Sequence, residues 1–219
     1  MGRKTKRVGF FIVVGSIAFC AVIFLLYRYN YIPHRKYDTE FFGIEPYVSQ
    51  NDKDGDLTDD QTDILQSARQ YTTQKPRYKS RYYADGYPSD GYGVCTDVVA
   101  QAMLGAGYDL MELVDEDIRQ HQKEYDILEP DKHIDFRRVK NLKVYFKNTA
   151  QSLTTDIYDI ESWHGGDIVI FKKHIGIVSD KRNKKGIPFV IHHANPFQAD
   201  YEEDILEIWS KVEGHYRIQ

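Results

Sequence analysis

The sequence has few of the residues that hold a small domain together covalently. Only two of its 219 residues are cysteines, and one of them, Cys20, falls inside a long apolar run. The other, Cys95, therefore has no intramolecular partner outside a membrane, which excludes a disulfide-stabilised scaffold. The chain also has no internal repeats and no low-complexity tracts. A chain of this length is expected to hold one ordinary globular domain plus accessory segments.

Acidic residues are missing from the first 36 positions. That segment holds seven of the 29 Lys and Arg residues, so the remainder has 22 basic against 33 acidic side chains. Sequence-independent affinity for nucleic acid depends on Lys and Arg placed against phosphates. The acidic body of the chain therefore excludes nucleic acid as a partner.

A run of twenty residues, Val8 to Tyr27, contains no charge. As a helix it would rise roughly 30 Å, which matches the hydrocarbon thickness of a bilayer. No small-residue cleavage site follows Leu26, and the bulky Phe19 precedes Cys20, where a lipoprotein signal has a small residue. The run is therefore interpreted as an uncleaved transmembrane anchor rather than a signal peptide.

The basic residues that flank the run predict its orientation. Four of them and the free amine precede it, and three follow it: Arg3, Lys4, Lys6, Arg7, then Arg28, Arg35 and Lys36. This bias predicts a single-pass protein of the cell membrane with its N-terminus inside. The expected organisation is a cytoplasmic basic segment (1–7), a transmembrane anchor (8–27), a stalk or linker (28–54) and an extracytoplasmic domain (55–219).

Helical patterns come first in the domain and short strands come second. Helices are expected over 58–71, directly after Cys95, and over 110–125, with one more helix or an irregular segment within 133–148. Short apolar runs separated by turn residues predict strands at 167–171, 174–180, 188–194 and 214–218. This order indicates an α+β class with a C-terminal antiparallel meander.

A cysteine and three histidines form the candidate reactive site. Cys95 stands at the start of a predicted helix, a position that favours the thiolate needed for nucleophilic attack. His174 opens the strand HIGIV, and His192 and His193 end the strand FVIHH. Two adjacent antiparallel strands would bring His174 beside one of the pair. On spacing alone, catalysis and a structural role for a packed cysteine and hydrogen-bonded histidines stay equally open.

Motifs around these residues add a family resemblance. They are Gly166-Asp167 before an apolar strand, His174-Ile-Gly-Ile177, His192-His193-Ala194, and Tyr83 twelve positions before Cys95. Over residues 55–219 the chain resembles the NlpC-type papain-like superfamily of bacterial cell-wall cysteine peptidases and amidases. The segments GVCTDVV, HIDFRRV and GHYR look closer to an uncharacterised branch of that superfamily, a domain of unknown function.

The resemblance implies a fold, a reaction and a substrate. The fold would be papain-like, with the helix of Cys95 packed on the C-terminal sheet. Cys95 would be the nucleophile and His174 the base, with His192 orienting His174 and Tyr83 lining the site. His193 would point to the opposite face of its strand. The substrate would be an amide bond in peptidoglycan stem peptides or in another peptide, and no cofactor is implied.

One departure from the family pattern leaves two alternatives. The usual Asp-Cys-Ser-Gly is Val94-Cys95-Thr96-Asp97 here. Asp97 puts a charge beside the nucleophile, and it is interpreted as an early-helix acid that interacts favourably with the helix dipole. The alternatives to a hydrolase are a papain-like acyltransferase and a non-catalytic, membrane-anchored binding or scaffold module on the same fold.

An acidic segment precedes the first helix of the domain. Its carboxylates fall at positions 1, 3, 5, 9 and 12 of a calcium-like loop: Asp52, Asp54, Asp56, Asp60 and Asp63. However, Gly55 is at position 4, where a calcium loop has its glycine at position 6, and an aspartate replaces the bidentate glutamate. The sequence therefore favours a solvated, helix-capping acidic run without a metal, with structural calcium as the alternative.

Overall fold

The structure is a computed structural model that describes residues 2–219, with side chains from Phe10 onward. An N-terminal unit ends at His34, and a larger unit runs from Arg35 to Gln219. The first unit contains α1 (Gly2–Arg28). Its segment Phe10–Arg28 has a mean hydropathy of 2.7 and is long and apolar enough to cross a membrane. The basic side chains expected at the start of the chain lie outside the described residues.

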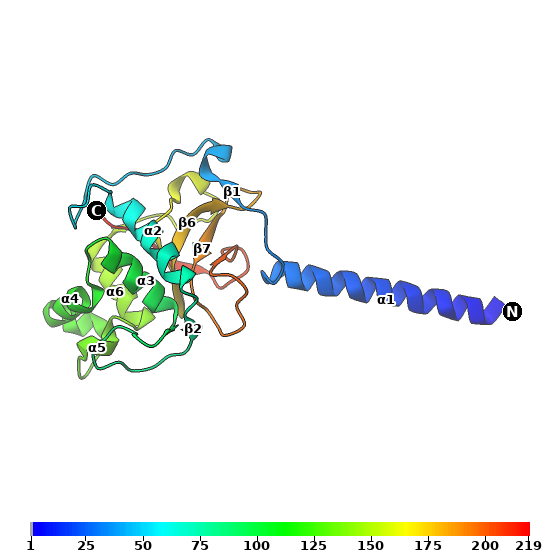
Figure 1. The fold of residues 1–219 in the computed structure, drawn as a ribbon, viewed down its shortest axis with the longest axis horizontal. Helices are drawn as coiled ribbons and strands as arrows, with labels where there is room; N and C mark the ends of the chain where they lie inside the picture. Colours follow the sequence, from blue (N-terminus) through cyan, green and yellow to red (C-terminus); the bar gives the residue numbers. More distant parts are fainter. Residues whose placement is uncertain (1) are drawn as a thin grey trace. The chain divides into compact units, whose positions relative to one another are not determined.

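The larger unit has most of its helices before its strands, which confirms the predicted α+β class (Figure 1). Its helices are η1 (Thr39–Phe42), α2 (Asp60–Thr73), α3 (Cys95–Gly105), α4 (Leu110–Tyr125), α5 (Lys132–Asp135), α6 (Val139–Thr149) and η2 (Ile160–Ser162). Its strands are β1 (Tyr37–Asp38), β2 (Arg77–Tyr78), β3 (Tyr92–Gly93), β4 (Gln151–Ser152), β5 (Ile168–Phe171), β6 (His174–Arg182), β7 (Pro188–Ile191), β8 (Glu202–Glu203) and β9 (Val212–Arg217).

The main sheet is antiparallel throughout, as predicted, but it is not a simple meander. Its order is β4-β9-β5-β6-β7-β8, and β1 pairs with the far end of β6. The last strand, β9, lies between β4 and β5, so it pairs on both sides. Strands β2 and β3 form a separate parallel pair ahead of α3.

The sheet buries apolar side chains on both faces. Ile168 and Ile170 of β5 belong to the core shared with α2, α3, α4 and α6. The alternate residues, Val169 and Phe171, belong to a second core with Trp163 on the opposite face. Successive strand side chains point to opposite faces, so an uninterrupted apolar strand such as IVIF is covered on both sides.

A buried carboxylate joins β5 to β9. Asp167 accepts hydrogen bonds from Nε2 of His215 at 2.9 Å, from Nε and Nη2 of Arg217 at 2.7 Å each, and from Nε2 of Gln61 at 2.9 Å. Burial alone would raise the pKa of Asp167, but the hydrogen bonds from His215 and Arg217 outweigh it and lower that pKa. The motifs Gly166-Asp167 and GHYR therefore meet in one structural network.

The predicted stalk, residues 28–54, differs from the structure over its second part. Tyr37 and Asp38 pair with Arg182 and Lys181 at the end of β6. The Thr39 hydroxyl donates a hydrogen bond to the Asp180 carbonyl at 2.7 Å. The reason is the length of β6, whose last residues extend beyond its pairing with β5 and leave backbone groups for another strand. The folded unit therefore begins at Arg35 rather than at residue 55.

Candidate active site

Cys95 is the first residue of α3. The preceding Val94 is extended and caps the helix, and its N–H donates to Oδ2 of Asp97 at 2.8 Å. A Cβ at Gly93 would collide with the Tyr71 hydroxyl, so a larger residue at this place would require the Tyr71 side chain to move. The thiol is thereby held at a helix N-terminus, where free N–H groups and the helix dipole stabilise negative charge.

Asp97 is not a solvated acid. Its carboxylate accepts hydrogen bonds from Nε of Arg137 at 2.6 Å and from Nη2 of Arg137 at 2.9 Å, and the two side chains are 1% and 2% exposed. Nη1 of Arg137 donates to the Arg81 carbonyl at 2.6 Å. Asp97 lies in the first turn of α3, as expected, but Arg137 also neutralises it inside the domain. The sequence offered only an indirect signal for Arg137, its place in the HIDFRRV motif.

His174 and His192 are in direct contact. Nε2 of His174 lies 3.1 Å from Nδ1 of His192. The register Ile177 to Ile191 makes them a diagonal pair on one face of β6 and β7. Nε2 of His192 lies 3.2 Å from Oε2 of Glu203 in β8. The imidazoles of His174 and His192 and the carboxylate of Glu203 thus lie in a row across three neighbouring strand segments. Spacing along the sequence did not predict the place of Glu203.

His193 lies on the other side of its strand from His192. Its ring packs edge-on against Tyr78, with centroids 5.2 Å apart, and against Tyr201, at 5.1 Å. Trp209 instead packs on the His174 and His192 rings, at centroid distances of 4.4 and 5.0 Å. The structure therefore places His192, rather than His193, against His174.

The thiol of Cys95 lies beside the first residues of β6. The main-chain N–H of Ile175 hydrogen-bonds the sulfur, and Ile175 directly follows His174. Because His174 uses Nε2 for the contact with His192, Nδ1 is the ring nitrogen left for another partner. The thiol therefore lies beside the main chain at the start of β6, the strand that His174 opens.

Burial keeps these groups neutral. It raises the pKa of Cys95 to about 11, although the N–H groups of Ile175 and Thr96 act in the opposite direction. Burial, followed by the neighbouring His192 and His193, lowers the pKa of His174 well below its usual value. The pKa of His192 falls to about 3 for the same main reason. At neutral pH the resting site therefore holds a thiol and neutral imidazoles rather than an ion pair.

Tyr83 contacts Asp90 and Arg137. Its hydroxyl donates to Oδ1 of Asp90 at 2.7 Å, and the guanidinium of Arg137 lies 5.0 Å from its ring centroid. Burial and the hydrogen bond to Asp90 raise its pKa to about 12. Tyr78 is close enough to Cys95 that, after burial, the negative charge of a Cys95 thiolate is the next cause that raises the pKa of Tyr78. The pairing of β2 with β3 brings Tyr78 beside Gly93, a contact that spacing along the sequence did not predict.

A pocket with a volume of about 320 Å³ opens beside these side chains. Tyr78 and His193 form part of its wall, and Gln198 reaches from it to His192, with Nε2 3.2 Å from the His192 carbonyl. The remaining lining residues are two prolines and five basic, aromatic or small polar residues: Pro76, Pro196, Lys75, Arg77, Tyr92, Asn195 and Tyr201. The pocket is therefore polar and partly cationic where it borders the histidines.

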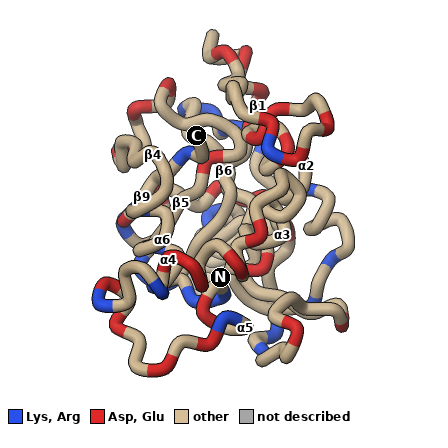
Figure 2. The backbone as a smooth tube through the Cα atoms, turned by 90° about the vertical axis from the view of Figure 1, so that its left-hand side faces the viewer, with Lys and Arg blue, Asp and Glu red and all other residues tan. Residues whose placement is uncertain are grey.

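Two of those cations belong to a larger group. Lys75, Arg77, Lys79 and Arg81 alternate along the segment that contains β2, and we call them the basic strip. The side-chain cations of the last three lie 5.1, 5.7 and 4.3 Å from the ring centroid of Tyr92. Acidic residues are common elsewhere in the unit, for example along α4 (Figure 2). The basic strip is therefore a local exception in an acidic domain.

Comparisons with known proteins place the domain in a family. Residues 65–218 match the model of the domain of unknown function DUF1287. The uncharacterized protein YijF of Escherichia coli (strain K12) is 36% identical over 151 residues, which cover 65% of this chain and 72% of that protein. No solved structure matches the chain significantly.

Proposed function

The chain belongs to the DUF1287 family, and we propose that it is a membrane-anchored cysteine hydrolase that cleaves an amide bond. The observation that carries this proposal is the arrangement at the start of β6. There the Cys95 sulfur accepts the N–H of Ile175, and the adjacent His174 is oriented by His192. A nucleophile, a base and an orienting group are the minimum set for acyl transfer through a thiol.

In the proposed reaction, Nδ1 of His174 removes the thiol proton as the Cys95 sulfur attacks the carbonyl carbon of the amide. The main-chain N–H of Cys95, free at the start of α3, stabilises the oxyanion. His174 then returns the proton to the leaving amine, and a thioester remains on Cys95. Water, deprotonated by His174, attacks the thioester and releases the acid and the thiol. His192 holds Nε2 of His174 throughout.

Cys95 and His174 are both uncharged before a substrate binds. This state suits a base that removes the thiol proton only while the sulfur attacks the amide. With the pKa of the thiol raised and that of His174 lowered by burial, the proton stays on sulfur until a substrate is present. An oxyanion and a polar substrate entering the site would favour the charged imidazolium. His174 therefore acts as a general base in this proposal, rather than as the permanent partner of a thiolate.

The papain-like assignment of the fold is part of the proposal. Its support is the order of elements, with the helix of the cysteine first and an antiparallel sheet carrying the histidines second. The NlpC-type motifs HIGIV and IHHA fall on β6 and at the end of β7, which is where the resemblance requires them. The same resemblance in motifs and order supports the proposal that the domain belongs to the NlpC-type superfamily.

We propose peptides that carry free carboxylates as substrates, with peptidoglycan stem peptides as the first candidate. Lys75 and Arg77 line the pocket next to Tyr78 and His193, and cations at that place attract carboxylates. The remainder of the domain is acidic and would repel the same groups. The basic strip would then fix the direction in which the peptide enters.

The location rests on α1. We propose that Phe10–Arg28 spans the cell membrane with the N-terminus inside, because basic residues are more numerous before the span than directly after it. The catalytic unit would then face the cell wall. Protease added to intact protoplasts should digest that unit, and its full protection would contradict the orientation.

The reaction is tested with the full-length protein in detergent, incubated with purified peptidoglycan, and the soluble products are identified by mass spectrometry. We expect new peptide fragments from the unmodified protein and from Cys20→Ser, which leaves Cys95 as the only thiol. Cys95→Ala should release none. Products joined to an added amine would identify an acyltransferase. Cleavage that persists in Cys95→Ala would refute the proposal, and a lack of products from every protein would favour the binding module.

A further inference from the structure

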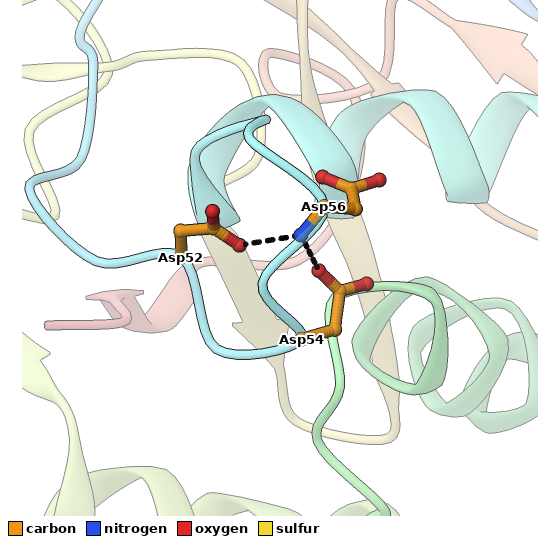
Figure 3. A group of neighbouring side chains, drawn as sticks. All are labelled: Asp52, Asp54 and Asp56. Carbon is orange, nitrogen blue, oxygen red and sulfur yellow. Dashed lines mark hydrogen bonds between the residues drawn. The ribbon is translucent and has the colours of Figure 1, made fainter.

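The acidic loop before α2 is held together by its own hydrogen bonds. The Asp52 carboxylate accepts the main-chain N–H groups of Asp56 at 3.1 Å and Leu57 at 2.9 Å, and Asp54 accepts that of Asp56 at 3.2 Å (Figure 3). Aspartate side chains commonly bond the backbone two or more residues on in this way. Asp59 then caps α2. Turn and cap hydrogen bonds therefore explain why these carboxylates lie together.

An exposed aromatic group lies at the start of the larger unit. The ring of Tyr37 lies 5.0 Å from that of Phe41 and 6.1 Å from that of Phe42, and the last two are 5.1 Å apart, all between centroids. The guanidinium of Arg35 lies 4.8 Å from the Tyr37 centroid. Phe41 is 70% exposed. We call these four residues the aromatic cluster, and an apolar group left uncovered in this way indicates contact with a surface outside the unit.

The turn that carries Phe41 is fixed to the sheet. The pairing of β1 with the end of β6 holds the residues before it, and the Thr39 hydroxyl donates to the Asp180 carbonyl at 2.7 Å. Gly43 ends η1 with a φ of +70°, and its N–H donates to the Glu40 carbonyl at 3.0 Å. Phe41 is therefore held outward on an ordered turn, so that binding through it costs little loss of backbone freedom.

The covalent chain keeps the aromatic cluster close to the end of the apolar segment. Nε2 of His34 lies 2.6 Å from the carbonyl oxygen of Tyr27, and the two rings stack with centroids 4.0 Å apart. Tyr27 belongs to the last turn of α1, within the segment that is long and apolar enough to cross a membrane. Tyr37 follows His34 by only three residues, which span at most about 11 Å. Chain connectivity alone therefore limits how far Tyr37 can lie from the end of that segment.

The residue types in this part of the chain suit the boundary between lipid and water. Tyr29 and Tyr31 follow directly after the apolar segment, and both are exposed. Aromatic rings are enriched where the hydrocarbon of a bilayer meets water, and apolar side chains there insert to the depth of the headgroups. Residues 35–42 have a net charge of zero, because two basic side chains balance two acidic ones: Arg35, Lys36, Asp38 and Glu40. Attraction to a surface would therefore come from the rings rather than from charge.

We propose that the aromatic cluster docks on the outer surface of the membrane that α1 crosses, with Phe41 inserted at the level of the lipid headgroups. This inference rests on the proposed role of α1 as a transmembrane anchor. The cluster and α1 are then two points of attachment rather than one. The larger unit consequently keeps one face toward the lipid, and the pocket beside His192 keeps a constant direction relative to the membrane.

The test uses the full-length protein reconstituted into phosphatidylcholine vesicles, with or without bromine on the acyl chains near the headgroups, because bromine quenches tryptophan fluorescence on contact. Phe41→Trp places a reporter in the aromatic cluster. Leu128→Trp is the matched control, since Leu128 is 97% exposed between α4 and α5, on the opposite side of the unit from β1 (Figure 1). The unmodified protein gives the background from Trp163 and Trp209. Circular dichroism verifies that each variant is folded.

We expect bromine to lower the added fluorescence of Phe41→Trp by about half or more, and that of Leu128→Trp by less than about a tenth, because only the first reporter reaches the headgroups. Sodium chloride raised from about 0.1 M to about 1 M should leave the quenching unchanged, since the charges balance. The docking is overturned by equal quenching of the two variants, by quenching that disappears at high salt, or by unquenched Phe41→Trp in protein that stays with the vesicles through an alkaline wash. Loss of the protein in that wash would refute the membrane span itself, and the docking with it.

Discussion

At the scale of single residues, the start of α3 and the burial of the site act on the Cys95 thiol in opposite directions. The helix N-terminus and the N–H of Ile175 favour the thiolate, whereas the closed surroundings favour the thiol, and burial is the larger effect. The same surroundings keep His174 and His192 uncharged. The thiol is thereby less open to oxidation, because the thiolate is the form that oxidants attack.

Alanine substitutions of His174, His192 and His193 should lower activity to different extents. His174→Ala removes the base and should be nearly as damaging as Cys95→Ala. His192→Ala should lower kcat and leave measurable activity, because an orienting residue contributes less than the base it orients. His193→Ala should keep kcat near that of the unmodified protein, since His193 contacts Tyr78 and Tyr201 rather than His174.

The measurement is the rate of product release from peptidoglycan by each purified variant. Circular dichroism serves as the control that each one is folded. A mild His192→Ala together with a severe His193→Ala would contradict the assigned pairing of the histidines and would make His193 the partner of the base.

At the scale of elements, the buried pair of Asp97 and Arg137 connects α3 to the segment between α5 and α6. Asp97→Asn leaves the guanidinium buried without a counter-charge and should cost about 3–5 kcal/mol of unfolding free energy. Arg137→Met should cost a similar amount. The double variant should cost less than the sum of the two, because neither charge is then left alone.

Urea unfolding of the four proteins measures these differences. Glu213→Gln, which breaks the exposed ion pair with Lys143, is the matched control and should change stability little. Strictly additive effects of the two substitutions would show that the charges are not coupled.

Local periodicity predicted the helices well. Residues 110–125 were expected as a helix and form α4, and the helix expected from residue 58 begins two positions later, because Asp59 serves as its N-cap. The strands that carry His174 and His192 were also located, since their apolar runs end at turn residues. These features depend on neighbours in the chain, which the sequence displays directly.

The missed features depend on contacts between distant segments. Asp97 and Arg137 are 40 positions apart, and nothing local distinguishes Asp97 from a surface acid. Glu203 reaches His192 through the pairing of β8 with β7, and residues 37–38 join the sheet because β6 is longer than its neighbours. Likewise, Tyr78 reaches Gly93 through the pairing of β2 with β3. Spacing along the chain does not contain this information.

At the scale of the whole molecule, the buried histidines make stability depend on pH. His192 has a pKa of about 3 and His193 of about 4 in the folded protein, both because of burial, against roughly 6.5 in an unfolded chain. Protons therefore bind the unfolded state preferentially below pH 6.5. Stability is fully present above that value and is lost as pH falls toward the folded pKa values.

For the fully buried His192, the loss between pH 7 and pH 5 should be about 2 kcal/mol. Asp63, whose pKa is raised to about 6, acts in the opposite direction and offsets part of the loss. Urea unfolding at pH 7, 6 and 5 measures the slope, and His192→Gln should reduce it by about one proton. A stability that rises on acidification would show that these histidines are charged in the folded protein.

The position of β9 inside the sheet has a consequence for the order in which the protein matures. His215 and Arg217 come near the end of the chain, yet they complete the partners of Asp167, and β9 separates β4 from β5. During synthesis, the segments with Cys95 and His174 are made before β9, the strand that completes their sheet. The sheet that carries His174 is therefore completed only after β9 has been made, so the pairing of its central strands depends on a late contact between distant segments.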